Sequence, residues 1–283
     1  MKKKRWAKAV IYAFLVIFAV VALFPVLFTL VNSFMGAQEY AQYYGGLQNS
    51  LGQKGVLHLI PDRLTLEGYY NMLFAQPDYL MKFWLSLLMC FAIVAGQVVI
   101  AVLGGYALAK FRFPGRNIAF YGIILLMMMP YQVTLVSNYI VLDKMGLIGN
   151  YLSIILPGIF SALGVFLMRQ VIAAVPDGIM EAAKIDGAGA WRVLWRVVLP
   201  NCLPGLASLV IISFVDNWNM VEQPLVFLQD SFQYPLSTFL TQINAAQPAL
   251  GFACGLLAMI PPVLLFCFFE KELIQGIGYL EEK

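Results

Sequence analysis

The sequence predicts an all-α, polytopic membrane protein with six transmembrane helices. Of its 283 residues, 61% are hydrophobic and only 12% are charged, and the mean hydropathy is +0.80. This apolar content exceeds the roughly 45–50% that is typical of soluble domains, so a single water-soluble core could not bury it. Because backbone polar groups in lipid must be satisfied internally, each apolar run of about 20 residues is expected to form a helix.

Six apolar segments are each long enough to cross a bilayer. The first runs for about twenty residues after a basic N-terminus, which is longer than the apolar region of a typical signal peptide, so we expect it to be retained. The six helices are expected at residues 10–31, 83–109, 118–139, 152–175, 203–221 and 250–269.

The basic residues predict the orientation of these helices, because cytoplasmic loops carry an excess of Lys and Arg. Fourteen of the 18 Lys and Arg residues fall on the side of the two termini and of the 176–200 connection. The other four are Lys54, Arg63, Lys82 and Lys144. Both termini and the 176–200 loop are therefore expected in the cytoplasm. The same asymmetry explains the net charge of +3 without a nucleic-acid partner.

The expected organisation is a series of four segments. They are residues 1–31, a basic cytoplasmic N-terminus with the first transmembrane helix; 32–82, an extracytoplasmic loop; 83–269, a core domain of five transmembrane helices that includes the cytoplasmic loop 176–200; and 270–283, a cytoplasmic C-terminal tail.

The extracytoplasmic loop has two parts with different composition. Glycines favour a flexible tether over residues 42–56. Further along, Thr65 is placed to act as the N-cap of a short helix over residues 67–74. The aromatic residues of that helix share a face, so we expect it to pack.

The chain lacks the residue patterns of catalytic and metal sites. Its four cysteines, Cys90, Cys202, Cys254 and Cys267, lie in or beside apolar segments and form no CxxC pair, so we expect them to pack. The single histidine, His58, has no nucleophile setting in the surrounding sequence and is assigned no chemistry. No G-x-x-x-x-G-K-[ST] motif occurs, so any nucleotide hydrolysis must come from a partner.

The cytoplasmic connection is the most informative segment, because MEAAKIDGAGAWRVLWRVVLP is mostly polar and lies between two membrane spans. Pro176 and the acidic residues after it suit the first turn of a helix. We expect this helix over residues 176–185, with a turn at Gly187, which can take a left-handed backbone angle. The adjacent Ala182 and Ala183 would give it a smooth face for a partner.

A second short helix is expected over residues 190–198, with Pro200 ending it. Its apolar residues, which repeat at helical spacing opposite two arginines, are Trp191, Leu194, Trp195 and Val198. Such a helix fits a groove on a partner protein. The alternative is an interfacial helix on lipid headgroups, which tryptophan and arginine also favour. That alternative accounts for the second helix but not for the alanines and the turn before it.

These residues resemble the EAA coupling loop of the permease subunits of bacterial ATP-binding-cassette (ABC) importers. In that pattern, EAA is followed by three residues, a glycine and, further on, a closing LP. The matching residues are Glu181, Ala182, Ala183, Asp186, Gly187, Ala188, Leu199 and Pro200.

Other segments are similar to the carbohydrate branch of that family, specifically the smaller permease of maltose-type importers. They are GYALAK at 105–110, MMMP at 127–130, FLMRQ at 166–170, DNWN at 216–219 and QPLVFL at 223–228. The resemblance covers nearly the whole chain and implies the ABC type I importer permease fold. One departure is the ending GIGYLEEK in place of the G-A-V-K-G common in these permeases, so a regulatory contact of the usual tail is not carried over.

The resemblance implies a multi-pass subunit of the bacterial cell membrane that moves a sugar or oligosaccharide into the cytoplasm. Its implied partners are a second homologous permease in a heterodimer, two ABC ATPase subunits that bind ATP and Mg, and an extracytoplasmic solute-binding protein. The chain itself would bind no cofactor and catalyse no reaction. In the family, the glutamate at position 181 pairs with a basic group of the ATPase, so that ATPase closure rotates the membrane helices.

Polar residues within or next to the expected spans are candidates for the substrate pathway, since such groups at membrane depth face a cavity or another helix. The candidates are Gln97, Tyr131, Gln132, Asn138, Asp216, Asn217, Trp218 and Asn219. Amides and carboxylates suit sugar hydroxyls, and an indole suits the face of a sugar ring. The same groups also serve as hydrogen bonds between helices.

Two other functions are compatible with the sequence. The first is an ABC importer permease for another solute, such as a polyamine or a phosphonate, which would share the coupling loop but not the MMMP and DNWN segments. The second is a stand-alone membrane carrier or scaffold, which would act without ATP.

Overall fold

The computed structural model describes residues 2–48, 58–75, 78–246 and 248–274, and this part of the chain contains helices and no strand. It divides into two compact units. Unit 1 is Met1–Phe83 with Phe239–Ile260, and unit 2 is Trp84–Thr238 with Pro261–Lys283. The expected tether over 49–56 and the end of the expected tail, 275–283, lie outside the described residues.

Unit 1 is organised around α15, which packs against α1, α2 and α3. Its elements are α1 (Lys2–Asn32), α2 (Ala37–Gln48), α3 (Glu67–Tyr70), the π-helix η1 (Asn71–Ala75), the start of α4, most of α14 (Leu236–Ala246) and α15 (Pro248–Ala258). The ring of Phe252 on α15 meets the rings of Phe28 and Tyr40 edge-on. The buried hydroxyl of Tyr79 donates a hydrogen bond to the carbonyl of Cys254 at 3.0 Å.

The outer part of unit 1 confirms one expectation and corrects two. The short helix is present as α3 and η1. Thr65, however, does not cap it: the N-cap is Leu66, and the backbone N–H of Thr65 instead donates to the carbonyl of Phe34 at 2.8 Å. The tether is also wrong over residues 42–48, because α2 continues as a helix to Gln48.

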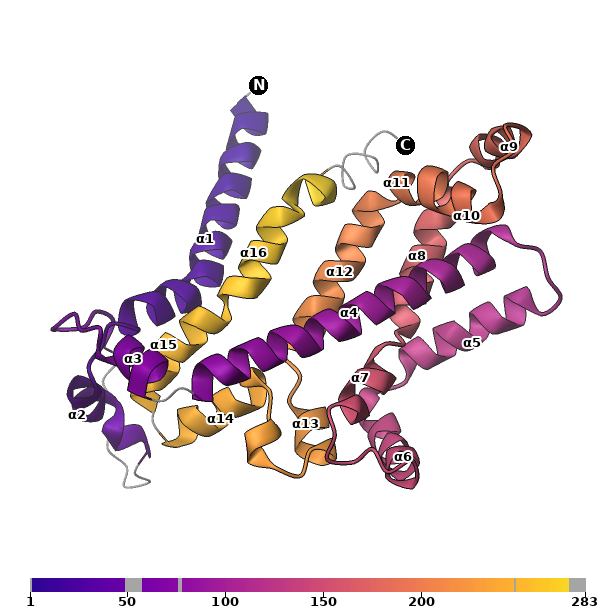
Figure 1. Cartoon of the computed structure of the whole chain (residues 1–283). Helices are drawn as coiled ribbons and strands as arrows, with labels where there is room; N and C mark the ends of the chain where they lie inside the picture. Colours follow the sequence, from indigo (N-terminus) through magenta and orange to yellow (C-terminus); the bar gives the residue numbers. More distant parts are fainter. Residues whose placement is uncertain (1, 49–57, 76–77, 247, 275–283) are drawn as a thin grey trace. The chain divides into compact units, whose positions relative to one another are not determined.

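Unit 2 contains the remaining helices. They are α4 (Asp78–Lys110) from Trp84 onward, α5 (Arg116–Met128), α6 (Tyr131–Lys144), α7 (Leu152–Gly158), α8 (Ala162–Ala174), α9 (Asp177–Ile185), α10 (Ala190–Val193), the π-helix η2 (Leu194–Val198), α11 (Leu199–Asn201), α12 (Leu203–Trp218), α13 (Glu222–Phe227), the 3-10 helix η3 (Ser231–Gln233) and α16 (Ile260–Phe268) from Pro261 onward. Within this unit α9 and α10 lie at one end, and α6 and α13 lie at the opposite end (Figure 1).

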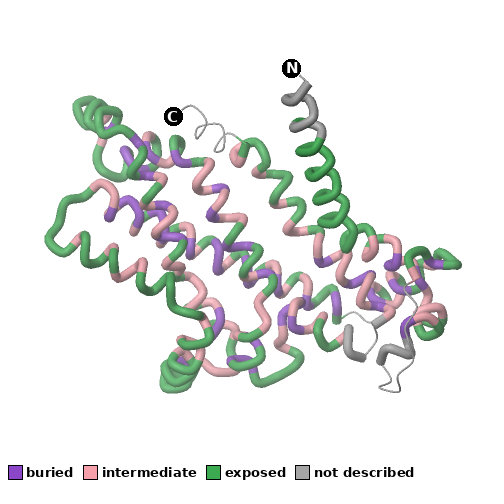
Figure 2. Tube along the Cα trace, turned by 180° about the vertical axis from the view of Figure 1, so that it is seen from behind, coloured by how far each residue is buried: buried purple, intermediate pink, exposed green. Residues whose placement is uncertain are grey.

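The described helices include four that are long and apolar enough to cross a membrane. They are Val10–Asn32, Asp78–Lys110, Leu152–Ala174 and Ala249–Phe268. Two further helix pairs pass the same test but are sharply bent, which gives up to six spans if each pair counts as one. The all-α membrane class is therefore confirmed, and the number six stays a prediction. Figure 2 shows that most of α1 is exposed, as expected of a helix that faces lipid or another subunit.

The third expected span, 118–139, is not one straight helix. The segments Arg116–Met128 and Tyr131–Lys144 meet at an angle of 102°. Proline disfavours a helical backbone at the residue before it, and Met129, which precedes Pro130, is extended with φ −74° and ψ 127°. The 13 residues of α5 reach about 20 Å, which is less than the hydrocarbon thickness of about 30 Å.

Helices α4 and α8 approach each other closely in the core of unit 2. A Cβ atom on Gly105 would lie only 2.8 Å from the backbone nitrogen of Arg169, so only glycine allows the two helices to come this near. Met168 and Ile172 on α8 are fully buried there. They belong to the apolar cluster that also contains residues of α4, α9, α10, η2 and α12. The 176–200 loop is thus built directly onto the core of the unit.

Candidate functional site

The start of α9 is fixed by a lysine from a distant helix. The Lys110 Nζ atom, at the end of α4, lies 2.7 Å from the Oδ1 atom of Asp177 and donates to the carbonyl of Val175 at 2.6 Å. The hydrogen bond and the positive charge of Lys110 lower the pKa of the Asp177 carboxyl. Because the lysine side chain is buried, these contacts tie the end of α8 and the first turn of α9 to α4.

The end of α9 is a Schellman turn centred on Gly187, as the sequence led us to expect of its left-handed glycine. Gly187 has φ +78°, and its N–H donates to the carbonyl of Lys184 at 3.0 Å. The N–H of Ala188 donates to the carbonyl of Ala183, also at 3.0 Å. The side chains of Ala183 and Ala188 both pack on the core cluster, which is the apolar contact that accompanies this motif.

The two faces of α9 have opposite environments. Met180 is buried in the core cluster, and Ala183 is half-buried against it. Glu181 and Ala182 are exposed, and Ile185 is 86% exposed. Ala183 therefore lies on the buried face of α9, and Ala182 lies on its exposed face. The bare surface carries an acid, a small residue and a large aliphatic residue, which together suit contact with another protein.

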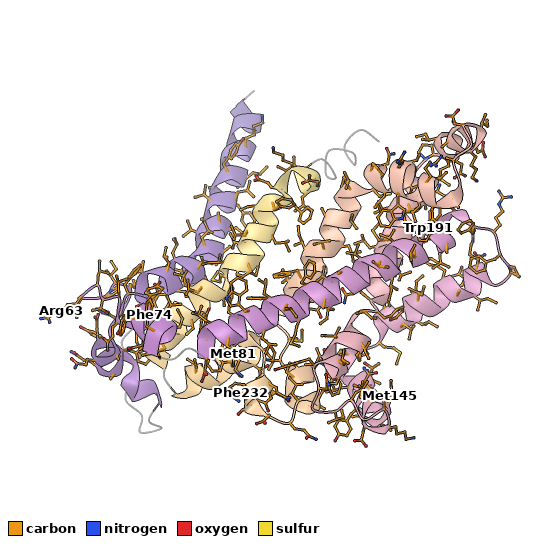
Figure 3. All side chains as sticks on the ribbon, in the orientation of Figure 1. Arg63, Phe74, Met81, Met145, Trp191 and Phe232 are labelled. Carbon is orange, nitrogen blue, oxygen red and sulfur yellow. The ribbon has the colours of Figure 1, made fainter. Side chains whose placement is uncertain are left out.

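The second helix of the loop differs from the expectation in two ways. Its apolar residues do not form one stripe: Leu194 and Val198 are buried, whereas Trp191 and Trp195 are 63% and 53% exposed. The exposed pair stacks, with ring centroids 6.5 Å apart, and Figure 3 shows Trp191 at the same end of unit 2 as α9. A helix with one apolar pair buried and one bare can meet both its own core and a partner.

Pro200 does not end this helix. The helical path from Ala190 runs on to Asn201, and it meets α12 at an angle of 81°. A π-helical turn over Leu194–Val198 directly precedes the proline-containing turn. Such a turn is a common way for a helix to accommodate a missing backbone donor. The chain changes direction only after Asn201, at Cys202.

Some of the candidate pathway residues gather at the opposite end of unit 2. Gln132, at the start of α6, donates to both carboxylate oxygens of Glu222 at 3.3 Å, at the start of α13. Asp216 and Asn219 are exposed at the end of α12, directly before α13 in the chain. The neighbouring Tyr131 is half-buried. The Gln132 group thus consists of Gln132 and Glu222, which are in contact, together with Asp216 and Asn219, which lie close to Glu222 in the sequence.

The other candidates have local structural roles. The buried Gln97 donates from Nε2 to the carbonyl of Gly158 at 2.6 Å and so joins α4 to α7. Asn217 donates to the carbonyl of Ser213 at 2.7 Å within α12. Trp218 is buried and stacks on Phe214. Asn138 is half-buried farther along α6, and the structure does not place it with the Gln132 group.

Two residues of these sites were not among the expected ones. Lys110 entered the sequence analysis as a basic residue for orientation and as the end of the GYALAK segment, but not as a site residue, because its partners are 65 and 67 positions away in the sequence and no local pattern connects them. Glu222 was not a candidate for the substrate pathway because it follows the expected fifth span and belongs to no apolar run. The sharp turn after α12 brings it to Gln132.

Comparison with known proteins places this architecture in context. Residues 97–277 match the family described as "Binding-protein-dependent transport system inner membrane component". The sn-glycerol-3-phosphate transport system permease protein UgpE of Yersinia pestis bv. Antiqua is 34% identical over 200 residues, which cover 68% of this chain and 70% of its own.

A second relative matches nearly end to end. The arabinooligosaccharides transport system permease protein AraQ of Halalkalibacterium halodurans is 29% identical over 276 residues, which cover 96% of this chain and 94% of its own. Among solved structures, one chain of a bacterial ABC transporter involved in the import of the acidic polysaccharide alginate superposes with a TM-score of 0.81 at 20% identity. That match covers 96% of this chain and 98% of the other. The two proteins therefore share one fold.

Proposed function

This chain belongs to the family of binding-protein-dependent transport system inner membrane components, the permease subunits of ABC importers, and we propose that it carries a sugar or oligosaccharide into the cytoplasm. The arabinooligosaccharide permease is similar to it over almost its whole length. The polar group of Gln132, Glu222, Asp216 and Asn219 supplies the acceptors and donors that such a cargo requires.

The proposed assembly follows from the family. This subunit pairs with a second, homologous permease, two ABC ATPase subunits bind ATP and Mg on the cytoplasmic side, and a solute-binding protein delivers the cargo from outside. Both chain termini and residues 176–200 lie in the cytoplasm in this arrangement, as the excess of basic residues on that side favours.

The proposed contact with the ATPase is the exposed face of α9, together with Trp191 and Trp195. One observation carries this proposal: the same helix that exposes Glu181, Ala182 and Ile185 buries Met180 and is bound at both ends, by Lys110 and by the Gly187 turn. A push on the exposed face is therefore transmitted to α4, α8 and α12 through packed side chains.

A charge reversal on the exposed face tests this coupling. We expect Glu181→Lys to leave membrane insertion unchanged and to lower ATPase co-purification and ATP-dependent uptake by at least about tenfold, since a close charge pair turned into repulsion costs more than about 1.4 kcal/mol. The matched control is Asp143→Lys, an equally exposed charge reversal on α6 at the opposite end of unit 2. Equal effects of the two variants, or none, would contradict the assignment.

The nature of the cargo has a second candidate, because the 34%-identical relatives are named for sn-glycerol 3-phosphate transport. Uptake of a labelled arabinooligosaccharide, glycerol 3-phosphate and a polyamine by the reconstituted complex separates the candidates. We expect the oligosaccharide to be taken up, and only with ATP. Preferential uptake of either of the other solutes would replace the proposed cargo, and uptake by this chain alone without ATP would identify a stand-alone carrier.

A further inference from the structure

A compact cluster in unit 1 takes no part in the proposed coupling or cargo path. It consists of Glu39 on α2 together with His58 and Asp62 of residues 58–66, the outer segment, which precedes α3. The His58 Nε2 atom lies 3.3 Å from the Oε1 atom of Glu39 and 3.6 Å from the Oδ1 atom of Asp62. One ligand-type atom from each of the three residues lies within 4.8 Å of the other two.

Two tyrosines fix the position of the histidine. The ring of Tyr43 stacks on the ring of His58, with centroids 3.9 Å apart and planes 5° from parallel. The hydroxyl of Tyr44 donates to the carbonyl of His58 at 2.6 Å and lies 3.1 Å from its backbone nitrogen, from which it accepts. Stacking and backbone contacts together leave the imidazole little freedom to rotate away from the two carboxylates.

The carboxylates are also held in place. Tyr43 donates its hydroxyl proton to the Oδ2 atom of Asp62 at 2.8 Å, which leaves the Oδ1 atom for His58. Glu39 accepts the backbone N–H of Asp62 at 2.6 Å through Oε1, an oxygen with a second lone pair still available. Such supporting bonds orient metal ligands in known sites.

The centre of the cluster lacks a bonding partner. The Nε2 atom of His58 is covered from solvent and makes no hydrogen bond, although two carboxylate oxygens are near. A bare lone pair on Nε2 next to two negative oxygens would be unfavourable, so this nitrogen either carries a proton or faces a cation that lies between it and the carboxylates. Zinc bonds to imidazole nitrogen and carboxylate oxygen at about 2.0–2.2 Å, which gives tetrahedral ligand separations of about 3.3–3.6 Å. The two measured separations fall in that range.

We propose that Glu39, His58 and Asp62 form a binding site for Zn²⁺. The imidazole favours zinc over calcium or magnesium, which prefer oxygen ligands alone. The two carboxylates balance the charge of the ion. The side chain of Asp62 is 61% exposed, so water can fill the remaining coordination position. The bound ion would join the 58–62 segment to α2 and stabilise this part of unit 1 by mass action.

Zinc counting on the assembled complex tests the site. After chelator treatment and equilibration with Zn²⁺, we expect the wild-type complex to retain one zinc ion more per copy of this chain than His58→Gln, by plasma mass spectrometry. Glu67→Gln, an exposed acid at the start of α3 that is outside the cluster, should retain as much zinc as the wild type. Tyr43→Phe, which frees Asp62, should bind zinc about tenfold more weakly.

Equal zinc content in the wild type and in His58→Gln would overturn the proposal and assign the His58 contact to a proton alone. If His58→Gln fails to assemble, Glu39→Gln keeps an acceptor for the Asp62 N–H and makes the same comparison, with an unchanged zinc content again overturning the site. The zinc count does not depend on cargo or on ATPase docking, so its failure leaves the proposed function untouched.

Discussion

The 176–200 loop and the outer segment of unit 1 are both polar connections, but they are held in different ways. In the loop, α9 and the helix that follows bury Met180, Leu194 and Val198 in the apolar core of unit 2. The outer segment between α2 and α3 is joined instead by hydrogen bonds between side chains and backbone, from the Tyr44 hydroxyl to the carbonyl of His58 and from the backbone N–H of Asp62 to the carboxylate of Glu39.

This difference relates to what each connection can transmit. A loop whose inner face is part of a close-packed core must move with that core, because such packing resists local deformation. A segment held by hydrogen bonds to partly exposed groups can open at a small cost in free energy. A connection of the first kind can transmit movement from one subunit to another. A connection of the second kind can be stabilised by a bound ion.

Opposite faces of α9 give the largest expected contrast. Met180→Asp should destabilise unit 2 by several kcal/mol, because it places an unpaired charge in the core cluster. Ile185→Asp, on the exposed face, should leave the melting temperature of the complex nearly unchanged yet reduce ATPase co-purification. Thermal melting and pull-down of both variants check this, and an equal loss of stability in the two would contradict the two-faced helix.

Removal of the lysine contact at the start of α9 should have the next largest effect. Lys110→Met keeps the buried stem but loses the charged hydrogen bond to the carbonyl of Val175, at a cost of about 1–3 kcal/mol. Lys110→Arg retains the donor and should lose less. We expect the melting temperature and the uptake rate to fall together in the methionine variant, and identical values for both variants would contradict a role of this bond.

The turn after α9 should respond to a change in backbone preference alone. Gly187→Val places a β-branched residue at φ +78°, which costs about 1–2 kcal/mol. Gly189→Val is the matched control, because its φ of −72° is ordinary and a Cβ atom has open space at both glycines. Uptake and ATPase co-purification should drop only in the first variant. Wild-type uptake and ATPase co-purification in Gly187→Val would contradict a role of this turn in coupling.

In the outer segment, the expected effects are smaller. Tyr44→Phe leaves the backbone N–H of His58 without its acceptor, which should cost about 1 kcal/mol in the local opening of the segment. Hydrogen exchange of the 58–62 amides measures this opening. The amides of α9 serve as the internal reference and should be unaffected. Faster exchange throughout both regions would show that the outer segment is not a separate unit of stability.

The smallest effect concerns pH. The pKa of Asp177 is lowered in the folded chain by Lys110, so the pair contributes stability above the ordinary aspartate pKa of about 3.9, and this contribution is lost as the pH falls through the lowered value. The melting temperature of Asp177→Asn should therefore lie slightly below that of the wild type at neutral pH and converge with it below about pH 4. A difference that grows toward acid pH would contradict the pairing.

Much of the fold follows from periodicity and composition. The apolar runs predict the membrane helices, and Asp186 and Gly187 predict the turn after α9, because these features depend on neighbouring residues. The bend at Pro130 follows from the local effect of a proline on the residue before it, which the expectation of one continuous span left out, whereas the passage of the helix through Pro200 depends on how the flanking segments pack. The partners of Lys110 and Glu222 are distant in the sequence, so only the folded chain reveals them.

Photo-crosslinking from Ile185 tests the central claim most directly. With p-benzoylphenylalanine at this position, which is 86% exposed, the account predicts a covalent adduct with the nucleotide-hydrolysing subunit of the complex. The same probe at Tyr70 of α3, which is 64% exposed, should give no such adduct. An adduct with the ATPase from Tyr70 and none from Ile185 would contradict the account.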